Sequence, residues 1–135
     1  FPGVLTEIAA GRLSPQAQDE TQMTYASKVK KKDGQIDWQT DTTETLLRKL
    51  RAYTPWPGLF TSWRGENFKI LAADRGQTIE GKQPGMVFKD EDEVYVQTVD
   101  GVLELIRVQL AGKKSLSITE FVRGEQEFVG SRLGE

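Results

Sequence analysis

Lysine and arginine side chains are the groups in this sequence whose spacing suggests a shared chemical task. Four ammonium groups fall within the five residues 28–32, and Arg48 and Arg51 stand three residues apart. Residues three apart on a helix lie on one side, so both guanidinium groups could face the same line of phosphates. The candidate phosphate-binding residues are Lys28, Lys30, Lys31, Lys32, Arg48, Arg51, Lys113 and Lys114.

Each of these cationic groups also has a simpler interpretation. A lysine run often does no more than keep an exposed segment solvated. Arg48 could pair with Glu44 across one helical turn, an interaction that contributes only about 0.3–0.5 kcal/mol. The two interpretations of Arg48 are compatible, because so weak a pair is readily exchanged for a phosphate contact.

Other kinds of chemistry have little support in the sequence. Histidine and cysteine are both absent, which excludes thiol nucleophiles, disulfides, Cys/His zinc sites and imidazole acid–base catalysis. The acidic turn Asp90–Glu93 lacks the spacing of a calcium loop, and Asp37 is expected to have a structural role. No phosphate-binding glycine loop or dinucleotide fingerprint is present. We therefore predict no catalytic residue and no metal site in this chain.

The charge is unevenly distributed along the 135 residues. The net charge is −2, yet residues 24–69 carry nine basic against five acidic residues, and residues 70–112 carry four against eight. One basic and one acidic region in a near-neutral chain indicate a face suited to a polyanion. There is no apolar run long enough to span a membrane, so we expect no membrane partner.

The cationic pair at 48 and 51 requires a helix to position it. Asp41 followed by Glu44 fits a capping box, which predicts that the helix begins at Asp41. An apolar stripe then follows at helical spacing, formed by Leu46, Leu47, Leu50 and Tyr53. The prolines in 54–58 end the helix, because they remove backbone donors and disfavour helical geometry at the residue before them.

The rest of the chain favours strands. Two-residue alternation predicts strands at Leu59–Trp63, Phe68–Ala73, Met86–Lys89, Val94–Val99 and Val102–Leu110, with a possible short strand at Thr78–Glu80. A slip of the apolar phase between Leu105 and Ile106 suggests a bulge. We predict a mainly β fold, a small closed antiparallel OB-like barrel with one short amphipathic helix before it and a short helix, Ser117–Gly124, after it.

Most aromatic side chains occupy positions of the apolar pattern. Core packing is therefore expected for Trp38, Trp56, Phe60, Phe68, Phe88 and Phe121. Trp63 and Tyr95 lie in predicted strands, where they could instead be exposed platforms for stacking bases.

The chain divides into three parts. Residues 1–12 carry a helical apolar pattern, residues 13–35 are polar and then lysine-rich, and residues 36–135 contain the predicted barrel. The first residue is Phe1 rather than Met, so we expect a fragment of a longer protein.

Several motifs resemble the carboxy-terminal domain of methionyl-tRNA formyltransferases. They are the segment Lys28–Trp38 ending in Asp-Gly-Gln-Ile-Asp-Trp, the run Arg51–Gly58 ending in Pro-Trp-Pro-Gly, and Gly112-Lys113-Lys114 followed by Phe121 and Gly124. The chain departs from the family pattern at a few positions. Lys32 replaces an acidic residue, Tyr53-Thr54 replaces Phe-Asn, and Leu116 replaces Met.

This resemblance implies a domain that binds initiator tRNA and works with an amino-terminal catalytic domain in cis. Residues 1–12 would then be the last helix of that domain, which would use formyl-tetrahydrofolate and hold the catalytic Asn, His and Asp. The fragment itself would bind no cofactor and be inactive alone. Two alternatives remain open. One is the accessory barrel of a related folate-dependent formyltransferase or hydrolase acting on a small molecule, and the other is a structural protein-binding barrel.

Overall fold

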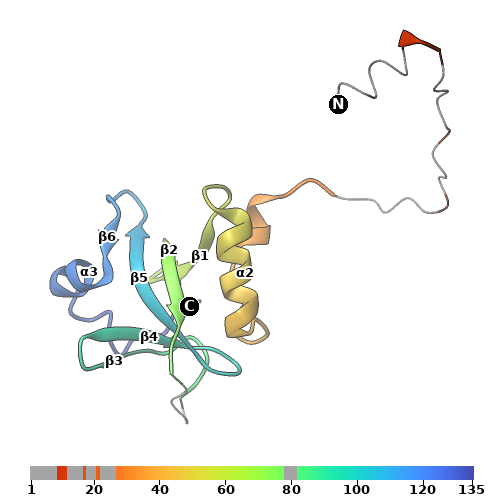
Figure 1. The fold of residues 1–135 in the computed structure, drawn as a ribbon. Helices are drawn as coiled ribbons and strands as arrows, with labels where there is room; N and C mark the ends of the chain where they lie inside the picture. Colours follow the sequence, from red (N-terminus) through yellow and green to blue (C-terminus); the bar gives the residue numbers. More distant parts are fainter. Residues whose placement is uncertain (1–8, 12–16, 18–20, 22–26, 78–81) are drawn as a thin grey trace.

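The computed structural model describes residues 9–11, 17, 21, 27–77 and 82–135 (Figure 1). Most of the predicted tail helix, much of the predicted linker and the possible strand Thr78–Glu80 lie outside the described residues. Among the described residues, none of the helices combines the length and apolar character needed to cross a bilayer.

The described chain forms one antiparallel sheet in the order β1-β2-β5-β4-β3, with β6 paired to β5. This confirms a mainly β fold whose strands lie close to the predicted positions. The strands are β1 (Leu59–Trp63), β2 (Glu66–Arg75), β3 (Val87–Asp90), β4 (Glu93–Gln97), β5 (Val102–Leu110) and β6 (Leu116–Ser117).

The bulge predicted in the last long strand is present. The pairing of β2 with β5 runs from Ala72 opposite Arg107 to Ala73 opposite Leu105, so Ile106 is skipped. The side chain of Ile106 is consequently exposed, while Leu105 and Val108 on either side are buried. An extra residue of this kind bends a strand and increases its twist, which helps a short sheet to curve around its core.

The predicted closure into a barrel is not confirmed, because the described sheet is an open path whose end strands, β1 and β3, do not pair with each other. Residues 128–134 bind to both strands instead. Val87 N–H donates to Ser131 O at 2.9 Å, and Gly134 N–H donates to Ser62 O at 2.9 Å. This segment therefore satisfies backbone groups at both sheet edges without forming a strand of its own.

Two helices flank the sheet (Figure 1). Helix α2 (Thr43–Tyr53) packs on β1 and β2, and α3 (Ile118–Gly124) packs near β4, β5 and β6. Helix α3 has the predicted capping box between Ser117 and Glu120. The predicted start of α2 is wrong, because Thr42 rather than Asp41 caps it by accepting a hydrogen bond from Thr45 N–H at 3.1 Å.

One continuous apolar core joins the sheet to both helices. Leu46 and Leu50 of α2 are buried in it, as the helical pattern predicts. Phe68, Phe121 and Phe128 pack with ring centroids 5.1–5.5 Å apart, and Trp63 lies edge-on to two of these rings. Ring contacts of this kind add to the stability that burial alone provides.

Two predictions about aromatic residues need correction. Trp56, expected in the core, has 62% of its surface exposed. Trp63, weighed as a possible exposed platform, is buried, and its indole N–H donates to Ser131 Oγ at 3.0 Å. Tyr95 is half-buried and stacks on Phe88 with ring centroids 5.6 Å apart. Trp63 therefore presents no free ring face for a base, and one face of Tyr95 is taken up by Phe88.

Candidate nucleic-acid interface

The lysine-rich segment includes a short 3₁₀ helix, η2 (Lys31–Gly34). Asp33 stabilises its start by accepting a hydrogen bond from Lys30 N–H at 2.7 Å, and Asp33 N–H donates to Lys30 O at 3.0 Å. Asp33 is thus engaged with the backbone, while the side chains of Lys31 and Lys32 are exposed. Lys28 and Lys30 are exposed as well, so all four predicted ammonium groups are accessible to a ligand.

The end of η2 packs tightly on the loop that follows α2. A Cβ atom at Gly34 would lie 1.9 Å from Gly58 O and 3.2 Å from Pro57 Cγ, so only glycine fits there. Ile36 N–H then donates to Phe60 O at 2.8 Å, which joins the segment to β1. These contacts fix the lysine-rich turn beside α2.

Helix α2 presents the two predicted arginines to solvent. Arg48 and Arg51 are exposed, on the side of the helix away from buried Leu46 and Leu50. Arg48 also forms the predicted pair with Glu44, its Nη2 lying 2.7 Å from Glu44 Oε1. Both side chains are more than half exposed, so the pair is weak and leaves Arg48 available for another anion.

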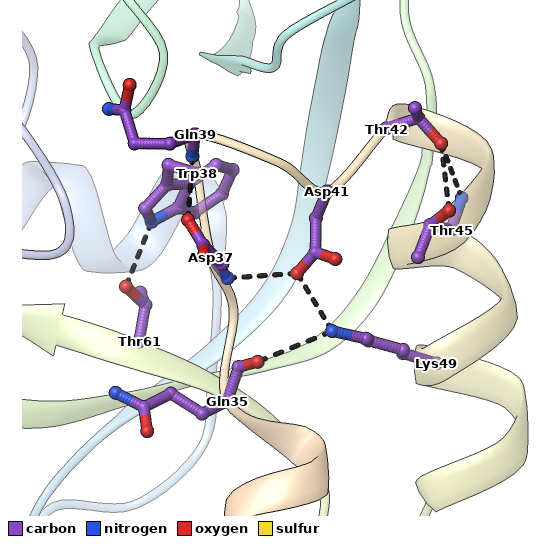
Figure 2. A network of polar contacts seen from close by, with 9 residues as sticks. All are labelled: Gln35, Asp37, Trp38, Gln39, Asp41, Thr42, Thr45, Lys49 and Thr61. Atoms are coloured by element: carbon purple, nitrogen blue, oxygen red, sulfur yellow. Dashed lines mark hydrogen bonds and ion pairs between the residues drawn. The ribbon is translucent and has the colours of Figure 1, made fainter.

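A network of polar contacts ties the segment before α2 to the helix itself (Figure 2). Lys49 Nζ lies 2.8 Å from Asp41 Oδ2, which also accepts a hydrogen bond from Asp37 N–H at 2.9 Å. The same ammonium group reaches Gln35 O at 3.5 Å. Lys49 thus links Gln35, which follows η2, to Asp41, which precedes the cap of α2.

Lys49 is a residue of this network that its local sequence does not point to. Its partner Asp41 is eight residues away, a separation that no helical pairing rule detects. The buried Trp38 anchors the same segment to β1, because its indole N–H donates to Thr61 Oγ1 at 2.9 Å. The orientation of α2 relative to η2 is therefore set by contacts between residues distant in sequence.

The first turn of α2 is held from the turn between β4 and β5. Asp100 Oδ1 accepts a hydrogen bond from Thr43 N–H at 3.0 Å, and Thr43 Oγ1 lies 2.7 Å from Thr98 Oγ1. The bond from Thr43 N–H, with those from the Thr98 and Thr43 hydroxyl groups, lowers the pKa of Asp100 against the opposing effect of burial. A carboxylate at this helix end also complements the helix dipole.

The last two predicted cations lie elsewhere. Lys113 and Lys114 are in the turn between β5 and β6, beside α3, whereas α2 and η2 lie on the other side of the sheet in Figure 1. Lys113 Nζ pairs with Glu125 Oε1 at 3.0 Å. The structure therefore brings the η2 lysines next to the α2 helix that carries Arg48 and Arg51, but it does not bring Lys113 and Lys114 to that surface.

Comparison with known proteins identifies the family. The model of the formyl transferase C-terminal domain matches residues 28–126, which is most of the chain. The chain belongs to the formyl transferase C-terminal domain family. The match spans η2, α2 and the whole strand path from β1 to β6, so it includes every cation discussed above.

Relatives of this formyl transferase domain include methionyl-tRNA formyltransferases. That of Dehalococcoides mccartyi (strain ATCC BAA-2266) is 42% identical over 121 residues, covering 89% of this chain and 38% of the relative. That of Magnetococcus marinus is 39% identical over 132 residues, covering 97% and 41%. The chain thus spans about two fifths of the length of these curated relatives.

Solved structures show the same fold in a protein with less sequence similarity. A variant of HypX from Aquifex aeolicus superposes with a TM-score of 0.65 at 21% identity, covering 96% of this chain and 23% of HypX. HypX in complex with tetrahydrofolic acid gives 0.64 at 22% identity, covering 93% and 22%. This fold therefore makes up about a quarter of the HypX chain.

Proposed function

We propose that this chain is the carboxy-terminal domain of a methionyl-tRNA formyltransferase and that it holds tRNA by its phosphate backbone. The observation that carries the proposal is the exposed cationic surface formed by the lysines of 28–32 with Arg48 and Arg51. These lysines and the two arginines together are called the η2–α2 surface. Residues 28–60 carry seven basic and four acidic residues, a balance of +3, whereas the remainder carries eleven against sixteen. A polyanion is the ligand that such a surface attracts.

Two of the four acidic groups in this region, Asp41 and Glu44, are paired with a cation. Asp41 is occupied by Lys49, and Asp33 accepts a hydrogen bond from the backbone of Lys30. Glu44 is engaged with Arg48 in an exposed pair that a phosphate oxygen can replace. Asp33 and Asp37 accept hydrogen bonds from backbone N–H groups and keep their negative charge. Seven cations against four carboxylates still leave residues 28–60 with a net positive charge.

Lys113 and Lys114 are proposed as a second, separate contact. A nucleic acid of tRNA size extends beyond one small domain, so it can meet both the η2–α2 surface and the turn beyond β5. Phosphate contacts position a nucleic acid without reading its sequence. We infer that the domain orients the aminoacylated end of initiator tRNA for a catalytic domain in cis and that recognition of the particular tRNA lies largely elsewhere.

Formyl transfer belongs, in this proposal, to a preceding cytoplasmic domain, with residues 1–12 as its last helix and residues 13–35 as the basic linker. Formyl-tetrahydrofolate would bind to that preceding domain, and we assign no catalytic step to the residues described here.

Titration of the 135-residue chain with tRNA at several salt concentrations tests the proposal. Binding should weaken as salt rises, and Arg51→Ala should lower the log–log salt slope by about 0.7–0.9 as one phosphate contact is lost. Lys89→Ala is the matched control, because it removes one exposed positive charge from β3 in the acidic region. Absence of salt-dependent binding, or an equal effect of both variants, would refute the proposal in favour of a structural or small-molecule role.

A further inference from the structure

Trp56 is the large apolar side chain that the proposed function leaves unexplained. Trp38 and Trp63 are buried and donate their indole N–H groups to Thr61 and Ser131, whereas Trp56 is 62% exposed. Within the described residues, no side chain stacks on its ring or hydrogen-bonds its indole nitrogen. An exposed indole of this size costs solvation free energy, so a ligand that covers it gains affinity.

The backbone that carries Trp56 is held in a defined place. Prolines on both sides restrict the main chain, and Gly58 N–H donates to Tyr53 O at 2.8 Å to close the turn directly after α2. Pro57 and Gly58 are packed against Gly34 at the end of η2. Because the main chain at Trp56 is already ordered, stacking of a planar ligand on the ring costs little backbone entropy.

The elements that adjoin this turn are cationic. Arg51 lies in the last turn of α2, and Lys32 lies two residues before the glycine that contacts the turn. A flat aromatic ring next to guanidinium and ammonium groups suits a nucleotide, whose base stacks while its phosphate is neutralised. A protein partner is less well matched, because the neighbouring charges would have to be desolvated or paired.

We propose that Trp56 stacks on an unpaired base of the bound RNA, at the edge of the η2–α2 surface. This inference rests on the proposed function and goes further, since it adds a contact to a base at a named residue. Bases inside a duplex are covered by their neighbours, so the stacking partner is a nucleotide in a single-stranded segment. Stacking tolerates any base, so the contact senses an unpaired base rather than its identity.

The experiment compares two RNA probes, a blunt duplex and the same duplex with a single-stranded 3′ extension. Trp56→Ala should weaken binding of the extended probe about fivefold to hundredfold and leave the blunt duplex unchanged. Trp56→Phe should retain most of the affinity, because a smaller aromatic ring still stacks. The salt slope should stay the same in both variants, since no phosphate contact is removed.

Intrinsic fluorescence gives a second readout that does not depend on the variant folding. The chain has three tryptophans, and only Trp56 is exposed, so stacking should quench its emission when the extended probe saturates the wild-type chain. Equal affinity of wild type and Trp56→Ala for the extended probe, with unquenched emission, overturns the inference while salt-dependent binding sustains the proposed function. Loss of thermal stability in the Trp56→Ala full-length enzyme with RNA affinity intact also overturns it, because the ring would then cover a protein surface. Failure of both probes to bind overturns the proposed function itself.

Discussion

Replacing Asp41 by alanine tests whether the buried network before α2 stabilises the domain. The Asp41 carboxylate accepts from Lys49 Nζ at 2.8 Å and from Asp37 N–H at 2.9 Å, and the two side chains of the ion pair are only 11% and 24% exposed. A hydrogen bond to a charged group contributes about 1.5–3 kcal/mol, and the Asp37 N–H would also lose its partner. We therefore expect Asp41→Ala to lower the free energy of unfolding by about 2–3 kcal/mol.

The same helix provides a matched control. The Arg48–Glu44 pair is equally short at 2.7 Å, yet its side chains are 69% and 57% exposed. Arg48→Ala should cost no more than about 0.5 kcal/mol, because water already solvates both charges. The difference between the two variants thus isolates the effect of burial from that of distance.

Urea unfolding followed by far-UV circular dichroism gives both free energies by linear extrapolation. A double-mutant cycle of Asp41→Ala with Lys49→Met should yield a coupling energy of about 1–2 kcal/mol, because the two residues contact each other directly. The reasoning is refuted if Asp41→Ala and Arg48→Ala destabilise equally, or if the coupling energy is below about 0.5 kcal/mol.

Two further predictions concern positions that fix α2 and η2. The pKa of Asp100 is lowered from 3.8, so its ionised form stabilises the fold above that value, and this stability is lost as pH falls through the folded-state pKa. In Asp100→Asn the urea midpoint should therefore fall less steeply below about pH 4 than in the wild type. At pH 7 the variant should lose less than about 1 kcal/mol of unfolding free energy, because the residue is exposed. An acid profile identical to that of the wild type would contradict this prediction. Gly34→Ala should destabilise by about 1–3 kcal/mol, because its Cβ would meet Gly58 O. In the same urea assay Gly124→Ala, whose Cβ would have open space, should stay within about 0.5 kcal/mol of wild type, and equal midpoints for the two glycine variants would disprove the argument.

Local patterns in the sequence were sufficient to predict most elements of the fold. The helical spacing of Leu46 and Leu50 and the prolines after Tyr53 determine where α2 buries its apolar side and where it ends. The phase slip at Ile106 predicted the bulge, because a one-residue insertion moves every later side chain to the other face. These features depend on neighbouring residues, which a single sequence displays.

Features that depend on distant residues were missed. Asp41 and Thr42 are both good helix caps, and the pairing of Asp41 with Lys49 left Thr42 as the cap. The closed barrel was predicted because open edges are unfavourable, but residues 128–134 cover those edges without any alternating pattern. Trp56 was assigned to the core from its place in the apolar pattern, whereas the turn between its two prolines leaves it exposed.

Pairing between residues distant in sequence also decides which cationic side chains share one surface. Eight cations could be named from residue type and spacing, and α2 places Arg48 and Arg51 as the helical period requires. The separation of Lys113 and Lys114 from the η2–α2 surface follows from the strand order, which a single sequence does not display. The strand order of the sheet therefore decides which of the eight cations lie close together.

The way the lysine-rich segment joins the domain affects what its charges can do. Lysines on a free tail must be ordered when they bind phosphate, and each such side chain costs about 0.5–1.5 kcal/mol of binding free energy. Here the backbone of η2 is already fixed by Gly34 on Gly58, by Ile36 on Phe60 and by Lys49 on Gln35. The backbone positions of Lys31 and Lys32 relative to the sheet are therefore set before any ligand binds. A surface of this kind contributes orientation as well as attraction, and the proposed function requires both.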